Sequence, residues 1–149
     1  MSNEEIKAIV RRFFEAFEAN DRATLKELLA PDLVAYLPGD PDQLSREAHL
    51  EIIRRWNTAF SDLHFTIEQQ NAEGDTVATR TTLRGVHSRG DFLGLPPTGK
   101  QIALSVMTME RITDGQIAER RVVLDVFGLM QQLGAMPAPG RRLAPAPGG

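Results

Sequence analysis

The sequence predicts an α+β fold in which N-terminal helices pack in a strongly curved, mainly antiparallel sheet. Apolar residues recur at helical spacing before residue 61, and they alternate with polar residues from Leu63 onward. Helices followed by hairpin-linked strands are typical of a sheet that is covered by helices on one face. A long sheet of this kind twists and can curl around its helices. We therefore expect a cone with one open mouth, which is a natural pocket for a small molecule.

The beginning of the chain predicts two helices. Ser2 and Glu5 can form a capping box at the start of the first helix, which runs to about Asn20. Asp21 can cap a second, shorter helix, and Pro31 is expected to stop it. Apolar residues lie on one face of each helix: Ile6, Ile9, Val10, Phe13, Phe14 and Phe17 in the first, and Leu25, Leu28 and Leu29 in the second.

A short strand and a third helix follow. The strand is expected from Asp32 to Leu37, because the turn-rich segment 38–41 ends it. Ser45 can cap the helix. The side chains that this helix turns inward are Ile52, Ile53, Trp56 and Phe60.

Four strands joined by hairpins occupy most of the remaining chain. We expect them over residues 63–71, 76–87, 100–112 and 116–125, with tight turns at Glu73-Gly74-Asp75 and Asp114-Gly115. One or two helical turns over 127–133 end at Gly134. One domain is therefore predicted over residues 1–134, and the Pro- and Gly-rich segment 135–149 is expected to be a flexible tail.

The composition of the chain excludes several classes of protein. With 149 residues, of which 42% are hydrophobic, the chain is long enough for one domain with a core. A net charge of −3 gives no electrostatic case for binding nucleic acid or an anionic membrane. The absence of cysteine removes disulfides and thiolate metal sites. The N-terminus does not have the pattern of a signal peptide, and no apolar run approaches the roughly 18 residues of a membrane span, so we expect a cytoplasmic protein.

The stretch from His87 to Lys100 reads His-x-Arg-Gly-Asp-Phe-Leu-Gly-Leu-Pro-Pro-Thr-Gly-Lys. It resembles the Gly-His-x-Gly-x-Phe-x-Gly-x-Pro-Pro-Thr-Gly-Lys segment of the SnoaL-like polyketide cyclases. Two later segments resemble the same family: Asp114-Gly115-x-Ile117-x-Glu119 and Asp125-x-x-Gly128-Leu129-x-x-Gln132-Leu133-Gly134. The resemblance covers roughly residues 4 to 134 and implies the NTF2-like cone. Because that superfamily contains cyclases, isomerases, epoxide hydrolases and binding proteins, the fold alone does not choose a function.

Asp125 is the predicted catalytic residue. It follows the apolar strand end Val122-Val123-Leu124, so we expect dry surroundings, which favour the protonated carboxyl and suit general acid/base catalysis. It stands where the resemblance places the catalytic Asp of the family. That position implies abstraction of an activated α-proton and then aldol ring closure, with neither metal nor cofactor. The alternative is a structural carboxylate that caps the next helical turn or pairs with Arg121.

Six residues are predicted to bind the substrate: Phe17, Tyr36, Trp56, Met107, Met109 and Arg121. Tyr36 stands where relatives commonly have His, and its phenol can donate to a substrate carbonyl. Arg121 stands where the family usually has an aromatic residue, and it can bind an oxygen-rich substrate or face the solvent. Met107 and Met109 lie on the same side of their predicted strand as Ser105. We expect this side to face the interior, because thioethers line adaptable pockets. For both methionines and both aromatic residues, simple core filling is the alternative.

These observations favour a cofactor-independent cyclase or isomerase that acts on a small hydrophobic carbonyl compound. The resemblance also implies a homodimer that pairs through the outer face of the sheet. One alternative is an epoxide hydrolase with a carboxylate–Arg–carboxylate set, drawn from Asp125, one arginine and one further acid. The candidates for these last two positions are Arg80, Arg111, Arg121, Glu110 and Glu119.

A binder of a hydrophobic molecule without catalytic activity is the other alternative. His49, His64 and His87 lie on different predicted elements without metal-ligand spacing, so no metal site is expected.

Overall fold

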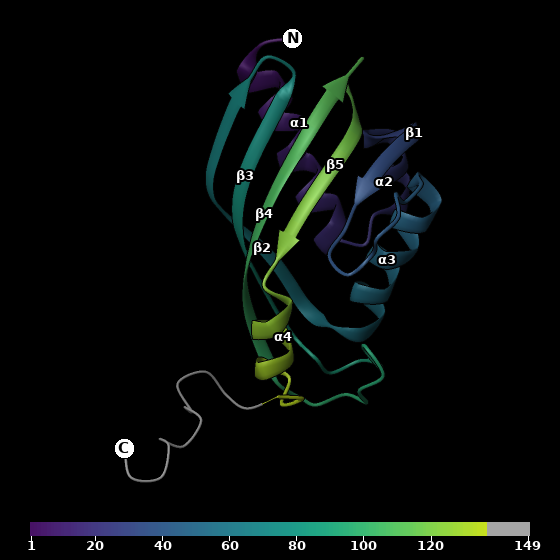
Figure 1. Cartoon of the computed structure of the whole chain (residues 1–149), viewed down its shortest axis with the longest axis vertical. Helices are drawn as coiled ribbons and strands as arrows, with labels where there is room; N and C mark the ends of the chain where they lie inside the picture. Colours follow the sequence, from purple (N-terminus) through teal and green to yellow (C-terminus); the bar gives the residue numbers. More distant parts are fainter. Residues whose placement is uncertain (137–149) are drawn as a thin grey trace.

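The computed structural model describes residues 1–136 and contains a five-stranded sheet with α1, α2 and α3 gathered on one side of it (Figure 1). The elements are α1 (Asn3–Glu18), α2 (Arg22–Leu28), β1 (Leu29–Tyr36), α3 (Arg46–Ala59), β2 (Ser61–Glu73), β3 (Thr76–Val86), β4 (Gln101–Thr113), β5 (Gln116–Leu124) and α4 (Val126–Gln132). The strand order is β1-β5-β4-β3-β2, and the β1–β5 pair is parallel whereas the other pairs are antiparallel. The predicted α+β class is confirmed. From residue 137 onward, the expected tail lies outside the described residues.

Side-chain caps fix the points at which the three N-terminal helices begin. The hydroxyl of Ser2 accepts the backbone N–H of Glu5 at 3.1 Å, and the Glu5 carboxylate accepts the backbone N–H of Ser2 in return. Asp21 and Ser45 each accept the backbone N–H of the residue three positions later, at the starts of α2 and α3. Each cap satisfies an N–H that has no partner within its helix. All three predicted caps are confirmed.

The second helix ends earlier than the sequence predicts. α2 ends at Leu28, and Leu29 already begins β1 at the edge of the sheet. Pro31 is therefore not a helix stop but an exposed residue of an edge strand, where no neighbouring strand needs its missing N–H. The pairing of β1 with β5 changes register between Leu29 and Val34, on either side of the proline.

Two hairpins build most of the sheet. In the turn between β4 and β5, Asp114 and Gly115 have φ angles of 51° and 76°, which match the right-handed twist of the flanking strands. β3 and β4 pair without interruption, whereas the β2–β3 and β4–β5 ladders each contain register shifts. Such irregularities bend strands, and here they occur in a sheet that curves along the helices (Figure 1).

Strand β4 alternates strictly between buried and exposed residues. Its buried set is Ile102, Leu104, Val106, Thr108, Glu110 and Ile112. Met107 and Met109 have the opposite parity and are 57% and 51% exposed, so the prediction that Ser105 and these methionines face the interior is wrong. The even-numbered set carries four aliphatic side chains, and burying them outweighs burying two thioethers.

The core lies between the sheet and the helices. α1 contributes seven buried residues: Ile6, Ile9, Val10, Phe13, Phe14, Ala16 and Phe17. At the other end of the chain, α4 follows β5 directly, and Leu129 and Leu133 close the core there. Among residues 1–136, no helix is long and apolar enough to cross a membrane.

Candidate active site

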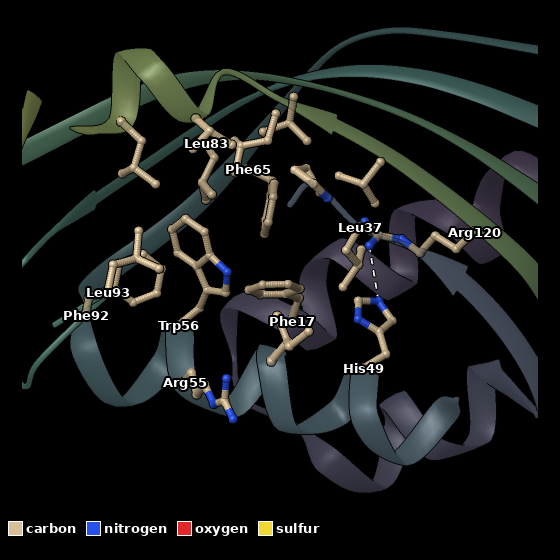
Figure 2. Close-up of a pocket in the computed structure, with 17 residues that line it drawn as sticks. Phe17, Leu37, His49, Arg55, Trp56, Phe65, Leu83, Phe92, Leu93 and Arg120 are labelled. Atoms are coloured by element: carbon tan, nitrogen blue, oxygen red, sulfur yellow. Dashed lines mark hydrogen bonds between the residues drawn. The ribbon is translucent and has the colours of Figure 1, made fainter. Parts of the chain in front are cut away.

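A pocket of about 310 Å³ lies between the sheet, α3 and the segments that follow β1, β3 and β5 (Figure 2). Most of its walls are apolar, and the charged side chains among its lining residues are Arg55 and Arg120. The lining residues are Phe17, Leu37, Pro38, His49, Ile52, Arg55, Trp56, Phe65, Leu83, Phe92, Leu93, Val106, Arg120, Val122, Leu124, Val126 and Leu129. A mostly apolar cavity with few polar groups is typical of a small-molecule site.

Aromatic side chains make two of the walls. The rings of Trp56 and Phe92 lie 4.6 Å apart between centroids, and those of Phe17 and Phe65 lie 5.0 Å apart. Two of these residues, Phe17 and Trp56, are sequence-predicted substrate contacts, and the structure places both on the pocket surface. Interlocked rings of this kind hold one another in place, so the apolar part of the pocket is preformed.

The segment between β3 and β4, which carries the family resemblance, holds Phe92 against the pocket. Its organising residue is His87, which is fully buried and lies 2.7 Å from the Gly90 carbonyl oxygen through Nε2. The backbone N–H of Thr98 donates to His87 Nδ1 at 3.3 Å. Nδ1 is therefore the acceptor and Nε2 the donor. His87 therefore holds the two ends of this loop together.

A buried polar group, which we call the Arg120 cluster, lies at one end of the pocket and consists of Arg120, Glu110, His49 and Thr108. Arg120 Nε donates to Glu110 Oε2 at 3.0 Å, and Arg120 Nη1 lies 3.1 Å from His49 Nε2. The Thr108 hydroxyl donates to the other Glu110 oxygen at 2.9 Å. Figure 2 shows Arg120 reaching into the pocket above His49. The cluster thus joins two strands to α3 across the core.

Electrostatics fix the charge of each member of the cluster. Burial raises the pKa of Glu110, and the Arg120 guanidinium opposes that shift. Both carboxylate oxygens of Glu110 accept hydrogen bonds, one from Arg120 Nε and one from the Thr108 hydroxyl. This geometry assigns Glu110 the ionised form, which balances the charge of the guanidinium. Burial, together with the positive charge of Arg120, lowers the pKa of His49 to about 3, so that this ring is neutral at pH 7.

The hydrogen bonds of His49 identify its tautomer. Arginine has no acceptor, so Arg120 Nη1 donates and His49 Nε2 accepts. The proton of the neutral ring is therefore on Nδ1, which is fully enclosed and has no hydrogen-bond partner among the described residues. With one nitrogen occupied and the other protonated, His49 is not available as a general base in this arrangement.

Asp125 lies at the edge of the pocket rather than in it. Its neighbours Leu124 and Val126 line the cavity, but Asp125 itself is exposed and forms the N-cap of α4. Its carboxylate accepts the backbone N–H of Gly128 at 2.8 Å. The prediction that Asp125 has dry surroundings is wrong, because the turn into α4 directs this side chain to the solvent. The catalytic role of Asp125 stays a prediction.

Tyr36 and Arg121 lie together but outside the pocket lining. The Arg121 guanidinium carbon stands 3.9 Å from the centroid of the Tyr36 ring, and Arg121 Nε is 3.4 Å from a Glu119 carboxylate oxygen. The two residues are register partners in β1 and β5. Met107 and Met109 lie on the same exposed parity of the sheet as Arg121, which is the cross-strand partner of Met109. Four of the six predicted substrate contacts therefore lie away from the cavity.

The members of the Arg120 cluster are functional candidates that the sequence did not identify as the polar end of a pocket. Glu110 shares its parity with Ile102, Leu104, Val106 and Ile112, and this apolar alternation is a signal that could have placed it inside. The arginines proposed for epoxide hydrolysis, namely Arg80, Arg111 and Arg121, are exposed. The buried Arg120 is hydrogen-bonded to one carboxylate and one histidine, whereas the arrangement expected for an epoxide hydrolase needs two carboxylates. In the described part of the chain, no three His, Asp or Glu side chains gather as a metal site requires.

Residues 7–133 match the SnoaL-like polyketide cyclase family. The chain belongs to this family. Its NTF2-like fold accounts for the helices packed against a curved sheet and for the pocket between them.

Individual relatives of this SnoaL-like protein agree with that assignment. It is 27% identical to the aklanonic acid methyl ester cyclase DnrD of Streptomyces peucetius over 129 residues, which cover 85% of this chain and 88% of the relative. The crystal structure of IdmH from Streptomyces antibioticus is 35% identical, with a TM-score of 0.77 over 87% of this chain and 98% of IdmH. TsrD from Streptomyces laurentii is 27% identical, with a TM-score of 0.81 over 91% and 99% of the two chains.

Proposed function

We propose that this SnoaL-like protein is a cofactor-independent cyclase or isomerase that acts on a hydrophobic, polyketide-like carbonyl compound. The observation that carries the proposal is the apolar pocket with one buried polar end, the Arg120 cluster. Apolar walls hold a ring system by burial of its surface, and a polar end orients it through an oxygen. Membership of a polyketide cyclase family supports the same substrate class.

The proposed reaction begins with removal of a proton from a carbon next to a carbonyl group. Flanking carbonyls make such a carbon acid strong enough for a carboxylate base. Asp125 is our proposed base, since its backbone lies between two pocket-lining residues, Leu124 and Val126. To act as the base, its carboxylate has to leave the helix cap on Gly128 and turn toward the cavity. The carbanion then attacks a second carbonyl carbon of the same molecule, and the base returns its proton to the new alkoxide.

The test is deuterium uptake at the α-carbon of 2-tetralone and of a cyclic β-keto ester in heavy water, followed by mass spectrometry. We expect wild type to catalyse uptake and Asp125→Asn to abolish it. Asparagine retains helix-capping ability, so the variant should fold. Asp21→Asn is the matched control, because Asp21 caps α2 in the same way and does not line the pocket. Full uptake by folded Asp125→Asn would refute the role of Asp125.

A protein that binds its ligand without turnover is the second candidate. The observation in its favour is that none of the described pocket-lining residues is a carboxylate. This candidate predicts that both carbonyl compounds bind equally well to wild type and to Asp125→Asn, and that neither protein accelerates deuterium uptake.

We also propose that two chains pair through the outer face of the sheet. Met107 and Val123 are cross-strand partners in β4 and β5, they are 57% and 70% exposed, and Met109 extends the patch. Sedimentation should give a dimer for wild type and a monomer for Met107→Asp. A wild-type monomer at assay concentrations would refute the pairing.

A further inference from the structure

The Arg120 guanidinium is held on three sides. Glu110 accepts from Nε, His49 accepts from Nη1, and the ring of Phe13 stacks on the guanidinium with 4.5 Å between its carbon and the ring centroid. These contacts come from three different elements, so the orientation of the group is fixed by the fold rather than by a ligand. A fixed donor costs no reorganisation when it binds a developing charge.

One nitrogen of the guanidinium remains free. Arg120 Nη2 has no hydrogen-bond partner within residues 1–136, and it is not one of the polar atoms that are both enclosed and unpaired. Since Arg120 lines the pocket, the open space that this nitrogen meets is the cavity. Figure 2 shows the end of the Arg120 side chain directed toward the cavity between the apolar walls. His49 Nδ1, by contrast, is enclosed by protein atoms, so a ligand does not reach it.

We propose that Arg120 binds the substrate oxygen, with Nη2 donating to the carbonyl whose α-carbon loses its proton. This inference rests on the proposed function and names the group that would stabilise its enolate. Arg120 is thereby a catalytic residue, because it touches the reacting system. Glu110, His49 and Phe13 are positioning residues that act through it.

The charge balance of the cluster favours a neutral carbonyl group over a carboxylate as the ligand group that accepts a hydrogen bond from Arg120 Nη2. Glu110 already neutralises Arg120 and His49 is uncharged, so the cluster has no net charge. A permanent anion would lose its hydration without a full countercharge. A carbonyl loses little hydration on binding, and its oxygen gains negative charge only as the proton leaves.

The test compares three ligands of similar shape: 1-tetralone with a carbonyl, tetralin without one, and 1-naphthoate with a carboxylate. We expect wild type to bind 1-tetralone roughly 10-fold more tightly than tetralin, since a hydrogen bond from a charged donor provides about that preference. Binding of 1-naphthoate should be no tighter than binding of tetralin. The infrared carbonyl stretch of bound 1-tetralone should lie at lower frequency than in hydrocarbon solvent.

Replacement of Arg120 alone would leave Glu110 buried without a partner. The double variant Glu110→Leu/Arg120→Met removes both charges and should fold. It should lose the preference for 1-tetralone and the infrared shift, while its affinity for tetralin stays within about 3-fold of wild type. Ile53→Val, a change on the same helix but outside the pocket lining, is the control and should keep both. A folded double variant that retains the preference would overturn the inference, as would a wild type without it.

Nitrogen NMR of His49 tests the positioning role without any ligand. The proton should be on Nδ1 at pH 7, and a proton on Nε2 would show that Arg120 does not donate there and would overturn the arrangement. The deuterium assay separates the two proposals. Ketone binding that depends on Arg120, together with no α-exchange by wild type, would remove the proposed function and the catalytic role of Arg120, and would leave its role in binding the carbonyl oxygen standing. If wild type catalyses deuterium exchange but the double variant binds the ketone as tightly as wild type, the proposed function stands and the role of Arg120 is refuted.

Discussion

Acidification should destabilise the protein through His49, and substitution of this residue should remove that sensitivity. Burial, assisted by the positive charge of Arg120, lowers the pKa of His49 from 6.5 to about 3. Between these two values the unfolded chain binds a proton that the folded chain rejects. The free energy of unfolding is therefore fully retained only well above pH 6.5, and it is lost progressively as the pH falls through 6.5 toward 3.

The size of this loss follows from the two pKa values. Proton uptake by the unfolded chain costs about 0.2 kcal/mol of stability at pH 7 and about 2 kcal/mol at pH 5. Urea unfolding at both pH values, followed by circular dichroism, measures the difference. We expect wild type to lose about 2 kcal/mol more than His49→Leu between pH 7 and pH 5.

Ile52→Val is the control for this experiment, because it changes the same helix without removing a titratable group. It should lower the unfolding free energy by a similar amount at both pH values. If His49→Leu shows the same pH dependence as wild type, the neutral, buried state of His49 is refuted.

Three further substitutions test the contacts described above. Glu110→Leu alone should lower the unfolding free energy by about 3–5 kcal/mol, because it leaves Arg120 as an unpaired buried charge, and the double variant with Arg120→Met should recover most of that loss in urea unfolding. Asp125→Ala should cost about 1 kcal/mol in thermal unfolding through loss of the α4 cap, whereas Asp125→Asn should cost less. Gly128→Ala should displace the Asp125 carboxylate, since an added Cβ would overlap its Oδ2, and stability unchanged from wild type would contradict the tight cap.

Local signals in the sequence predicted the fold well. Ser2, Asp21 and Ser45 mark three helix starts, because a capping side chain acts on the backbone three residues away. The pair Asp114-Gly115 marks a hairpin, since its two left-handed residues fit only a narrow class of turns. Pro31 misled the prediction because a proline that stops a helix and a proline in an edge strand look alike in sequence.

The polar end of the pocket was much harder to predict. His49 and Arg120 are 71 positions apart, and only the packing of α3 against the sheet brings them together. Arg120 and Arg121 are adjacent in the chain and point to opposite faces of β5, so the choice between them depends on strand parity. The β4–β5 pairing also changes register between Arg111 and Ile112, so the buried side of β5 cannot be predicted by counting from the buried side of β4.

The proline in β1 bears on how this protein avoids uncontrolled association. A strand at the edge of a sheet offers unpaired N–H and C=O groups on which another strand can add. Here Pro31 removes one donor and exposed Asp32 adds a charge beside it, at the point where the pairing with β5 is already irregular. Growth of the sheet from the β1 edge into open-ended aggregates is thereby disfavoured. The pairing proposed above uses the face of the sheet instead, and a two-fold contact of that kind closes after two copies.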